Sequence, residues 1–326
     1  MIDEAVKEVR DELEKMNEAI VNIALFGQPG SGKSSLINKI CGFKNDEKEA
    51  AVVGVETDKT VELAWHEAKG LRFADLPGYG TKNFPKDSYF QKFDIGQFDL
   101  FLCVTSGKFH QADTEFFQEL KQRGKVCIFV VNKHDELWED DATIEELEQR
   151  KRDDIAKQIG QRVDVLFTSC RKNTGLDELI NEIRNNLNGA KRERWERGAK
   201  AYSIKFLEEK RVVCEKYVAR AAKVAALNGV NPIPGADIAV DLTTMVALFS
   251  SIREAYGLND SSLAKLEMSS IPVVVQTANM VTRFATKEGA LRLLQNYAKA
   301  ETTKMISKYI PFVGQAIAAS LGYLIT

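Results

Sequence analysis

Apolar and polar residues follow two different patterns along this chain, one on each side of Gly189. Before Gly189, short apolar runs alternate with stretches whose apolar residues recur at helical spacing, which predicts a parallel sheet with helices on both faces. The apolar runs predict strands near 21–26, 61–66, 71–75, 99–105, 126–131 and 163–168. The helical stretches lie near 34–41, 111–122, 142–159 and 176–188. The expected fold class is therefore α/β, with a mostly parallel six-stranded sheet.

Beyond Gly189 the sequence contains almost no strand signal. Residues 190–197 are dense in charge and are expected to continue as a long helix; further helices are predicted over 199–228, 236–257, 261–297 and 300–326. Residues 2–19 also carry apolar side chains at helical spacing and need a partner surface. We therefore expect three parts: an N-terminal helix within 1–20 that packs with the helical domain, an α/β domain over 21–189, and an all-α domain over 190–326.

Composition and charge narrow the class of protein. The 326 residues include 45 Lys and Arg against 47 Asp and Glu, so the formal net charge is −2. This balance gives no electrostatic reason to expect nucleic acid as a partner. No apolar run clearly reaches the roughly 20 residues of a spanning helix, and the N-terminus does not read as a signal peptide. The five cysteines form no C-x-x-C pair. We therefore expect a cytoplasmic protein.

The clearest chemical motif is Gly-Gln-Pro-Gly-Ser-Gly-Lys-Ser at 27–34, between the first predicted strand and the first helix of the α/β domain. In a phosphate-binding loop of this spacing, the glycines turn successive backbone N–H groups toward the phosphates, and the helix start adds its positive dipole end. Lys33 is expected to reach the outer phosphates as a catalytic residue, and the Ser34 hydroxyl to coordinate Mg²⁺. The residues predicted to bind the nucleotide here are Gly27, Pro29, Gly30, Ser31, Gly32, Lys33, Ser34 and Ser35.

A second motif, Asp75-Leu76-Pro77-Gly78, ends the strand predicted at 71–75. An aspartate at this strand end is expected to hold Mg²⁺ through a water molecule, and the Gly78 amide to meet a terminal phosphate. A threonine before the strand at 61–66 should close over the metal. Thr60 is favoured for this metal-binding and catalytic role because it directly precedes the strand, and Thr57 is the alternative.

The residue after Gly78 bears on hydrolysis. A glutamine there would orient the attacking water. This chain has Tyr79 instead, which is expected to be a packing residue of the segment that follows Gly78. Pro29 also removes one backbone donor from the glycine loop. Intrinsic hydrolysis is therefore expected to be slow, or to be completed by Gln28, by Glu56 or by a second subunit.

Two later segments are expected to bind the base. In Asn132-Lys133-His134-Asp135, the Asp135 carboxylate accepts two N–H donors that guanine has and adenine lacks. Asn132 is expected to tie this loop to the glycine loop, and the Lys133 stem to pack over the ring. Residues 168–171, Thr-Ser-Cys-Arg, follow the last strand, and the backbone amides of Ser169 and Cys170 are predicted to meet the base oxygen. The expected ligands are GTP or GDP with Mg²⁺.

These motifs together resemble the immunity-related GTPases. The resemblance rests on the glycine loop, on Leu76-Pro77-Gly78 continued to Asn83-Phe84-Pro85, and on a helical half with a Pro-x-Pro-Gly turn at 232–235. It implies a Ras-like P-loop GTPase domain, a helical domain built from both chain ends, and a homodimer or homo-oligomer through the GTPase face. It also implies action at intracellular membranes, although the glycine at position two that myristoylation needs is absent.

Three function classes follow. The first is a GTPase that hydrolyses GTP to GDP weakly and is stimulated by self-association. The second is a GTP-dependent binding switch with slow turnover, and the third is a dynamin-like GTPase attached peripherally to membranes.

Overall fold

The computed structural model describes residues 15, 18–44, 50–51, 64–107, 110–228, 248–258 and 260–284. The chain divides into two compact units, one of Ala19–Trp195 and one of Met1–Glu18 with Glu196–Thr326. The helix predicted over 300–326 lies outside the described residues, and so do most of the helices predicted over 2–19 and 236–257. Residues 248–255, within the last of these, are helical.

Six strands of the first unit form one sheet in the order β2-β3-β1-β4-β5-β6. Neighbouring strands are parallel except β2 with β3, so the predicted mostly parallel six-stranded sheet is confirmed. β2 extends two residues beyond the predicted end at 66, and residues 61–63 lie outside the described part. The strands are β1 (Val21–Phe26), β2 (Ala64–Ala68), β3 (Leu71–Asp75), β4 (Leu100–Thr105), β5 (Cys127–Val131) and β6 (Val165–Phe167).

Four predicted helices of this unit are confirmed, namely α2 (Lys33–Cys41), α4 (Gln111–Gln122), α5 (Ile144–Ile159) and α6 (Leu176–Asn185). Three short elements were not predicted: α3 (Lys86–Lys92), η1 (Ile95–Gln97) and η2 (His134–Glu136). Each is at most seven residues long, which is too short for a helical period of apolar residues to stand out. α3 matters for the site because it directly follows the Asp75 to Gly78 motif.

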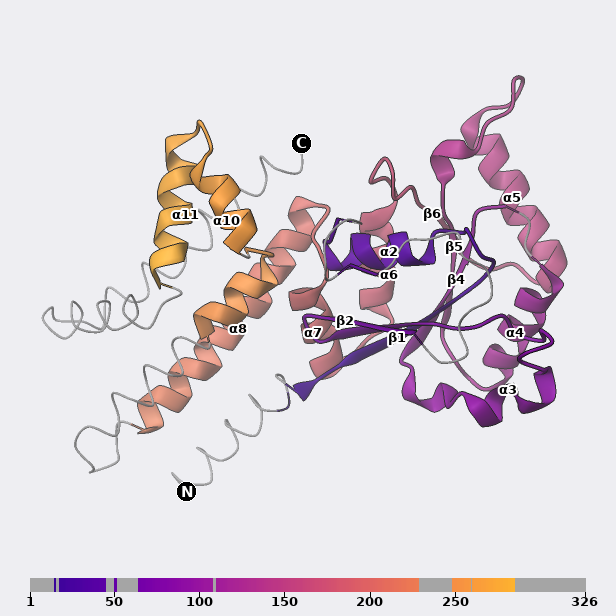
Figure 1. Ribbon diagram of the computed structural model, residues 1–326, viewed down its shortest axis with the longest axis horizontal. Helices are drawn as coiled ribbons and strands as arrows, with labels where there is room; N and C mark the ends of the chain where they lie inside the picture. Colours follow the sequence, from indigo (N-terminus) through magenta and orange to yellow (C-terminus); the bar gives the residue numbers. More distant parts are fainter. Residues whose placement is uncertain are drawn as a thin grey trace, which may run out of the picture. The chain divides into compact units, whose positions relative to one another are not determined.

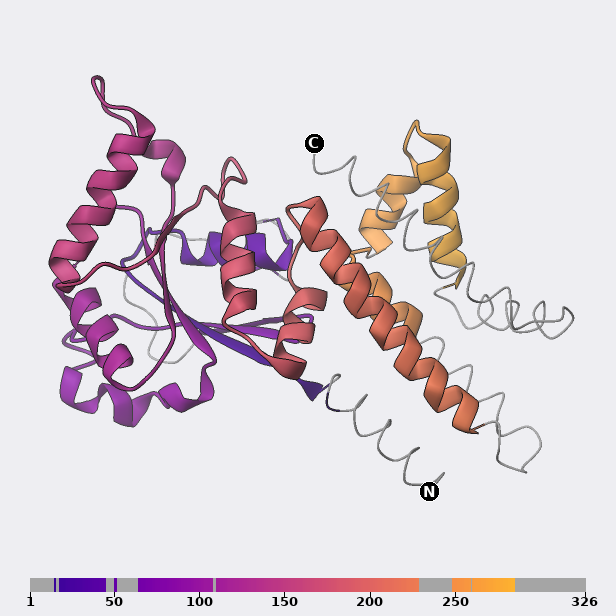
Figure 2. The ribbon, with the colours of Figure 1, turned by 180° about the vertical axis from the view of Figure 1, so that it is seen from behind.

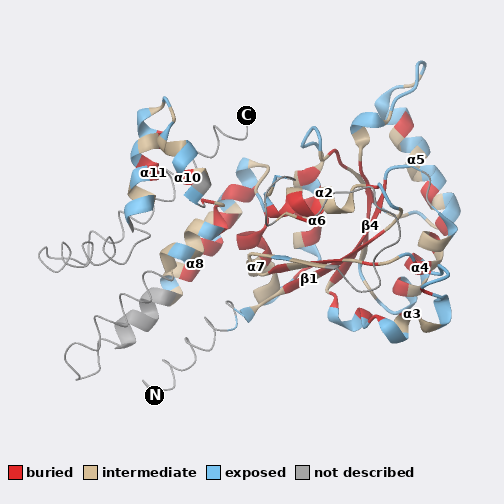
Figure 3. Cartoon of the chain, in the orientation of Figure 1, coloured by how far each residue is buried: buried red, intermediate tan, exposed pale blue. Residues whose placement is uncertain are grey.

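Helices cover both faces of the sheet. α2 contacts α6 on one face, whereas α4 contacts α5 on the other and packs there with α3 against the strands (Figures 1 and 2). β1, β3, β4 and β5 are buried over most of their length (Figure 3). β1 has β3 and β4 as its two neighbours. The chain therefore turns to opposite sides of β1, and the loop after β1 lies at the switch point where such sheets bind ligands.

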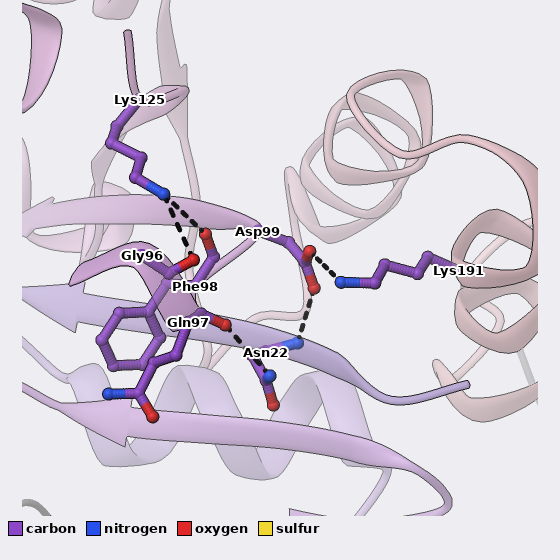
Figure 4. A network of polar contacts seen from close by, with 7 residues as sticks. All are labelled: Asn22, Gly96, Gln97, Phe98, Asp99, Lys125 and Lys191. Atoms are coloured by element: carbon purple, nitrogen blue, oxygen red, sulfur yellow. Dashed lines mark hydrogen bonds and ion pairs between the residues drawn. The ribbon is translucent and has the colours of Figure 1, made fainter. Parts of the chain in front are cut away.

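A polar network fixes the opposite end of β1 and β4 (Figure 4). The Asn22 backbone N–H donates to Asp99 Oδ2 at 2.9 Å, and the Asn22 amide donates to the Gln97 carbonyl at 3.1 Å. Asp99 also pairs with Lys191 of α7 (Gly189–Gly198). Because these contacts are far from the glycine loop, they hold the strand starts and the beginning of α7 without occupying the ligand end.

Two helix predictions for the chain beyond Gly189 are wrong. The charged helix at 190–197 does not run on: α7 ends at Gly198 and α8 (Ile204–Asn228) starts anew after Ser203, whose hydroxyl accepts the Phe206 N–H at 3.1 Å. The helix predicted over 261–297 is broken into α10 (Asp260–Glu267) and α11 (Pro272–Phe284). Pro272 has no N–H and suits the first position of a new helix, which explains the break.

A buried lysine joins three segments of this unit. Lys210 of α8 is 2% exposed, and its ammonium donates to the carbonyl oxygens of Arg197, Ala199 and Ala255 at 2.8, 2.8 and 2.6 Å. Around it, apolar residues of α8, of residues 248–258 and of α10 and α11 form a small core. The lysine satisfies carbonyls that the helix ends leave unpaired.

Two glycines with left-handed backbones provide a matched stability test. Gly175 begins α6 with φ 69°, and an added Cβ would lie 1.8 Å from the Phe167 carbonyl oxygen. Gly160 ends α5 with φ 80°, and nothing lies within 4 Å of its added Cβ. We expect G160A to lower the free energy of unfolding by about 1–2 kcal/mol, and G175A by at least about 3 kcal/mol because a clash adds to the backbone strain. Urea unfolding of both variants measures this, and equal losses would contradict it.

Candidate functional site

The glycine loop leaves β1 at the ligand end of the sheet and leads into α2. Glycine is required at two positions of the loop because a Cβ there would clash with a neighbouring group. A Cβ on Gly27 (φ 131°) would lie 2.0 Å from the Val104 carbonyl oxygen, and a Cβ on Gly32 (φ 92°) would lie 2.3 Å from the Asn132 amide nitrogen. The glycines of the motif therefore let the loop pass directly over β4 and against the base motif.

The loop presents backbone donors at the start of α2. Gly32 is the N-cap of α2 and no side chain caps the helix, so the first-turn N–H groups are available to an anion. Ser34 and Ser35 are half-buried in this turn, whereas Pro29 and Gly30 are exposed. Ser31 is 2% exposed, and its Oγ has no hydrogen-bond partner among the residues that the structure describes. Backbone donors at the start of a helix suit a phosphate chain.

Lys33 lies folded back over the loop. Its Nζ donates to the Gly27 carbonyl at 2.8 Å and to the Gln28 carbonyl at 3.3 Å, and lies 3.7 Å from Asp75 Oδ1. Burial raises the pKa of the Asp75 carboxyl, against the opposing charges of Lys33 and His66. A carboxylate that burial disfavours gains from a nearby cation, so the end of β3 is suited to a positively charged group.

Asn132 connects the two motifs. Its amide nitrogen donates to the Ser31 carbonyl at 3.0 Å, and its amide oxygen accepts from the Thr168 hydroxyl at 3.2 Å. Asn132 is 2% exposed and Thr168 is fully buried. The predicted tie between residue 132 and the glycine loop is therefore present, and it extends to the segment after β6.

Asp135 is held by that same segment. Its side chain is 12% exposed and accepts from the Ser169 hydroxyl, which lowers the pKa of the Asp135 carboxyl. The Ser169 N–H donates to the Thr174 carbonyl at 3.0 Å. Ser169 therefore faces Asp135 with its hydroxyl rather than offering its amide, and Cys170 is half-buried beside it. Arg171 is 79% exposed with Nη1 3.9 Å from Asp135.

Lys133 has a left-handed backbone, with φ 59°, between β5 and η2. The next residue closes the turn onto the β6 segment, since the His134 N–H donates to the Thr168 carbonyl at 3.0 Å. The base motif is therefore a fixed turn rather than a free loop.

Tyr79 packs as predicted. It is 8% exposed, and its ring centroid lies 5.1 Å from that of Tyr89, 5.9 Å from Phe90 and 5.0 Å from Phe116. We call these four residues the aromatic cluster. The Tyr89 hydroxyl donates to the Pro77 carbonyl at 2.8 Å. The cluster thus holds both sides of Gly78, which is itself exposed.

One contact of the loop was missed from the sequence. The Gln28 amide donates to Asp113 Oδ2 of α4 at 2.9 Å. No sequence signal identifies this pair, because an aspartate in the first turn of a predicted helix is also explained by the helix dipole. Thr57, Thr60 and Glu56 lie outside the described residues.

The Ser169 hydroxyl provides a pH-dependent prediction. A lowered folded-state pKa stabilises the protein above the unfolded-state pKa, and that contribution is lost as the pH falls through the folded-state value. We expect S169A to raise the pKa of Asp135 toward its ordinary value and to remove this contribution. Carboxyl ¹³C NMR titration measures the change, with S250A as a control at an exposed serine. An unchanged Asp135 titration would contradict the role of the hydroxyl.

Comparison with known proteins agrees with the motifs. A family model described as interferon-inducible GTPase matches residues 1–314. Interferon-inducible GTPase 5 of Bos taurus is 24% identical over 375 residues, covering 99% of this chain and 74% of the bovine protein. Interferon-inducible GTPase 1 of Mus musculus is 32% identical over 130 residues, covering 39% of this chain and 31% of the mouse protein.

Among solved structures, Toc33 from Arabidopsis thaliana is 14% identical with a TM-score of 0.39, covering 61% of this chain and 94% of that one. In the part of the chain that the structure describes, no helix is long and apolar enough to cross a membrane. Since the family model covers nearly the whole sequence, the chain belongs to the interferon-inducible GTPase family.

Proposed function

We propose that this protein binds GTP with Mg²⁺, hydrolyses it slowly to GDP, and self-associates through the face of the α/β unit that carries the nucleotide. The observation that supports this best is the set of hydrogen bonds from Ser31 through Asn132 to Thr168. It holds the phosphate loop and the base motif in one assembly, as a ligand with both phosphates and a base requires.

Guanine preference rests on Asp135. An ionised carboxylate accepts hydrogen bonds only, so it pairs with two N–H donors on one edge of a base and leaves an unsatisfied partner with adenine. The Ser169 hydroxyl holds the carboxylate in its ionised form. Lys133 packs over the ring, and the Cys170 amide meets the base oxygen.

The phosphates bind at Gly27 to Ser35. The backbone N–H groups and the start of α2 stabilise the negative charge of the phosphates. Lys33 exchanges its contacts with the loop carbonyls for contacts with the outer phosphates. Gly78 offers its amide at the terminal phosphate.

Magnesium fits the oxygen groups present. Ser34 would hold it directly and Asp75 through water, which are the hard oxygen donors that this ion prefers. Thr60, outside the described residues, would complete the set. When bound, the ion neutralises charge on the phosphates.

Hydrolysis needs a group that orients water, and neither Tyr79 nor Gln28 has a side chain free for this role. The Tyr79 ring is buried in the aromatic cluster, and the Gln28 amide is bound to Asp113. A second copy that completes the site is therefore the favoured mechanism. The same burial of Tyr79 supports the second candidate, a GTP-dependent binding switch with slow turnover.

The domain assignment belongs to the proposal too. We assign 21–189 to the GTPase domain and 190–326 to a helical domain joined by the N-terminal helix within 1–20. The proposed location is the cytoplasm, with peripheral contact to an intracellular membrane. The third candidate function is a dynamin-like, membrane-acting GTPase, and liposome co-sedimentation with and without a GTP analogue tests it.

Base recognition is tested with D135N. An amide replaces one acceptor by a donor, so we expect the affinity for GTP to fall at least about tenfold while that for xanthosine triphosphate rises. Competition binding with GTP, xanthosine triphosphate and ATP measures both. D164N, at an exposed carboxylate before β6, is the control. ATP that competes as well as GTP with the wild-type protein would disprove guanine recognition.

Self-association is tested by measuring GTP turnover per subunit across protein concentration. We expect specific activity to rise with concentration, because a second copy supplies the missing group, and K33A to lose both binding and turnover. Constant, measurable turnover would remove the need for a partner. Near-zero turnover at every concentration, with GTP still bound, would leave the binding switch.

A further inference from the structure

We propose that Asp113 is a positioning residue for the nucleotide site: through Gln28 it anchors the glycine loop to α4, the helix that also holds the segment after Gly78. This inference rests on the proposed function and adds a residue to the same site. It starts from the hydrogen bond between the Gln28 amide and Asp113 Oδ2, which is partly buried and 2.9 Å long.

The glycine loop needs anchors because its own backbone is permissive. Gly27, Gly30 and Gly32 all have positive φ, and glycine has more conformations to lose on ordering than any other residue. Asn132 holds the loop near its helix end by binding the Ser31 carbonyl. Asp113 holds it near its strand end by binding the side chain of Gln28.

The remaining ties come from Lys33 and from the loop itself. The Gln28 carbonyl accepts from the Ser31 N–H at 3.2 Å and from Lys33 Nζ at 3.3 Å. In the proposed function Lys33 turns to the phosphates, so its bonds to the loop carbonyls are lost when the nucleotide binds. Asp113 and Asn132 then remain as the side-chain anchors of the loop among the described contacts.

The turn of α4 that carries Asp113 also contacts the segment after Gly78. Two residues on, Glu115 forms an ion pair with Lys86 at the start of α3. One residue further, Phe116 packs against Tyr79 with ring centroids 5.0 Å apart. Residues 113–116 therefore contact both loops that are predicted to meet the terminal phosphate.

One turn of α4 therefore sets the positions of both loops. Asp113, which binds Gln28, and Phe116, which packs against Tyr79, are three residues apart and therefore neighbours on one face of α4. Catalytic geometry tolerates little displacement. Loss of the Asp113 anchor should therefore weaken nucleotide binding and also slow turnover, without unfolding the domain.

The test compares D113A with D113N. D113N keeps an oxygen that can accept from the Gln28 amide and should stay close to wild type. D113A removes a hydrogen bond to a charged group, so we expect about a tenfold rise in the Kd for GDP. Turnover at saturating GTP should fall as well, and the thermal midpoint of D113A should stay close to that of D113N. Q122A, at an exposed position of α4, is the control.

A double-mutant cycle separates positioning from a general structural effect. If Asp113 acts through Gln28, Q28A and Q28A/D113A should bind GDP as weakly as D113A alone. Additive losses, or a D113A variant with a lower thermal midpoint but an unchanged Kd, would overturn the inference. Wild-type protein that binds no guanine nucleotide would overturn the proposed function together with it; wild-type binding with equal D113A and D113N affinities would overturn this inference alone.

Discussion

The structure of the nucleotide site depends on one buried amide. Asn132 donates to the glycine loop and accepts from Thr168, so the loops after β1, β5 and β6 meet at a single side chain. Gly32 has no Cβ because the Asn132 amide occupies that space. An unsatisfied buried amide is costly, which means that the three loops stabilise one another only in this arrangement. The segments proposed to bind phosphate and base are thus parts of one packed unit.

A second constraint acts on the other side of the site. The aromatic cluster takes the residue that follows Gly78 into the core between α3 and α4, and the Tyr89 hydroxyl binds the Pro77 carbonyl. The Tyr89 hydroxyl satisfies a backbone carbonyl, while the rings of the cluster supply apolar contact. Ring packing and this hydrogen bond therefore hold the segment, and they keep the Tyr79 side chain buried.

The parts of the site that could be predicted are those that depend on neighbours in sequence. The glycine loop, Asp75 to Gly78 and Asn132 to Asp135 each follow a strand, and the alternation of apolar runs with helical stretches predicted the α/β sheet that was found. The Gln28–Asp113 bond joins residues 85 positions apart and could not be predicted from residue types. The break before α11 could have been predicted, since Pro272 is visible in the sequence. The break before α8 depends on a hydroxyl, Ser203, whose orientation only the fold determines.

Lys210 has a consequence for how the helical unit can be followed in solution. Its three donor positions are all used by carbonyl groups, and its side chain is buried. An amine-reactive reagent can modify it only when α8 separates from its neighbours, whereas Lys205 on the same helix is exposed. The ratio of labelling at these two lysines therefore reports the opening of the helical unit directly, with an internal reference five residues away.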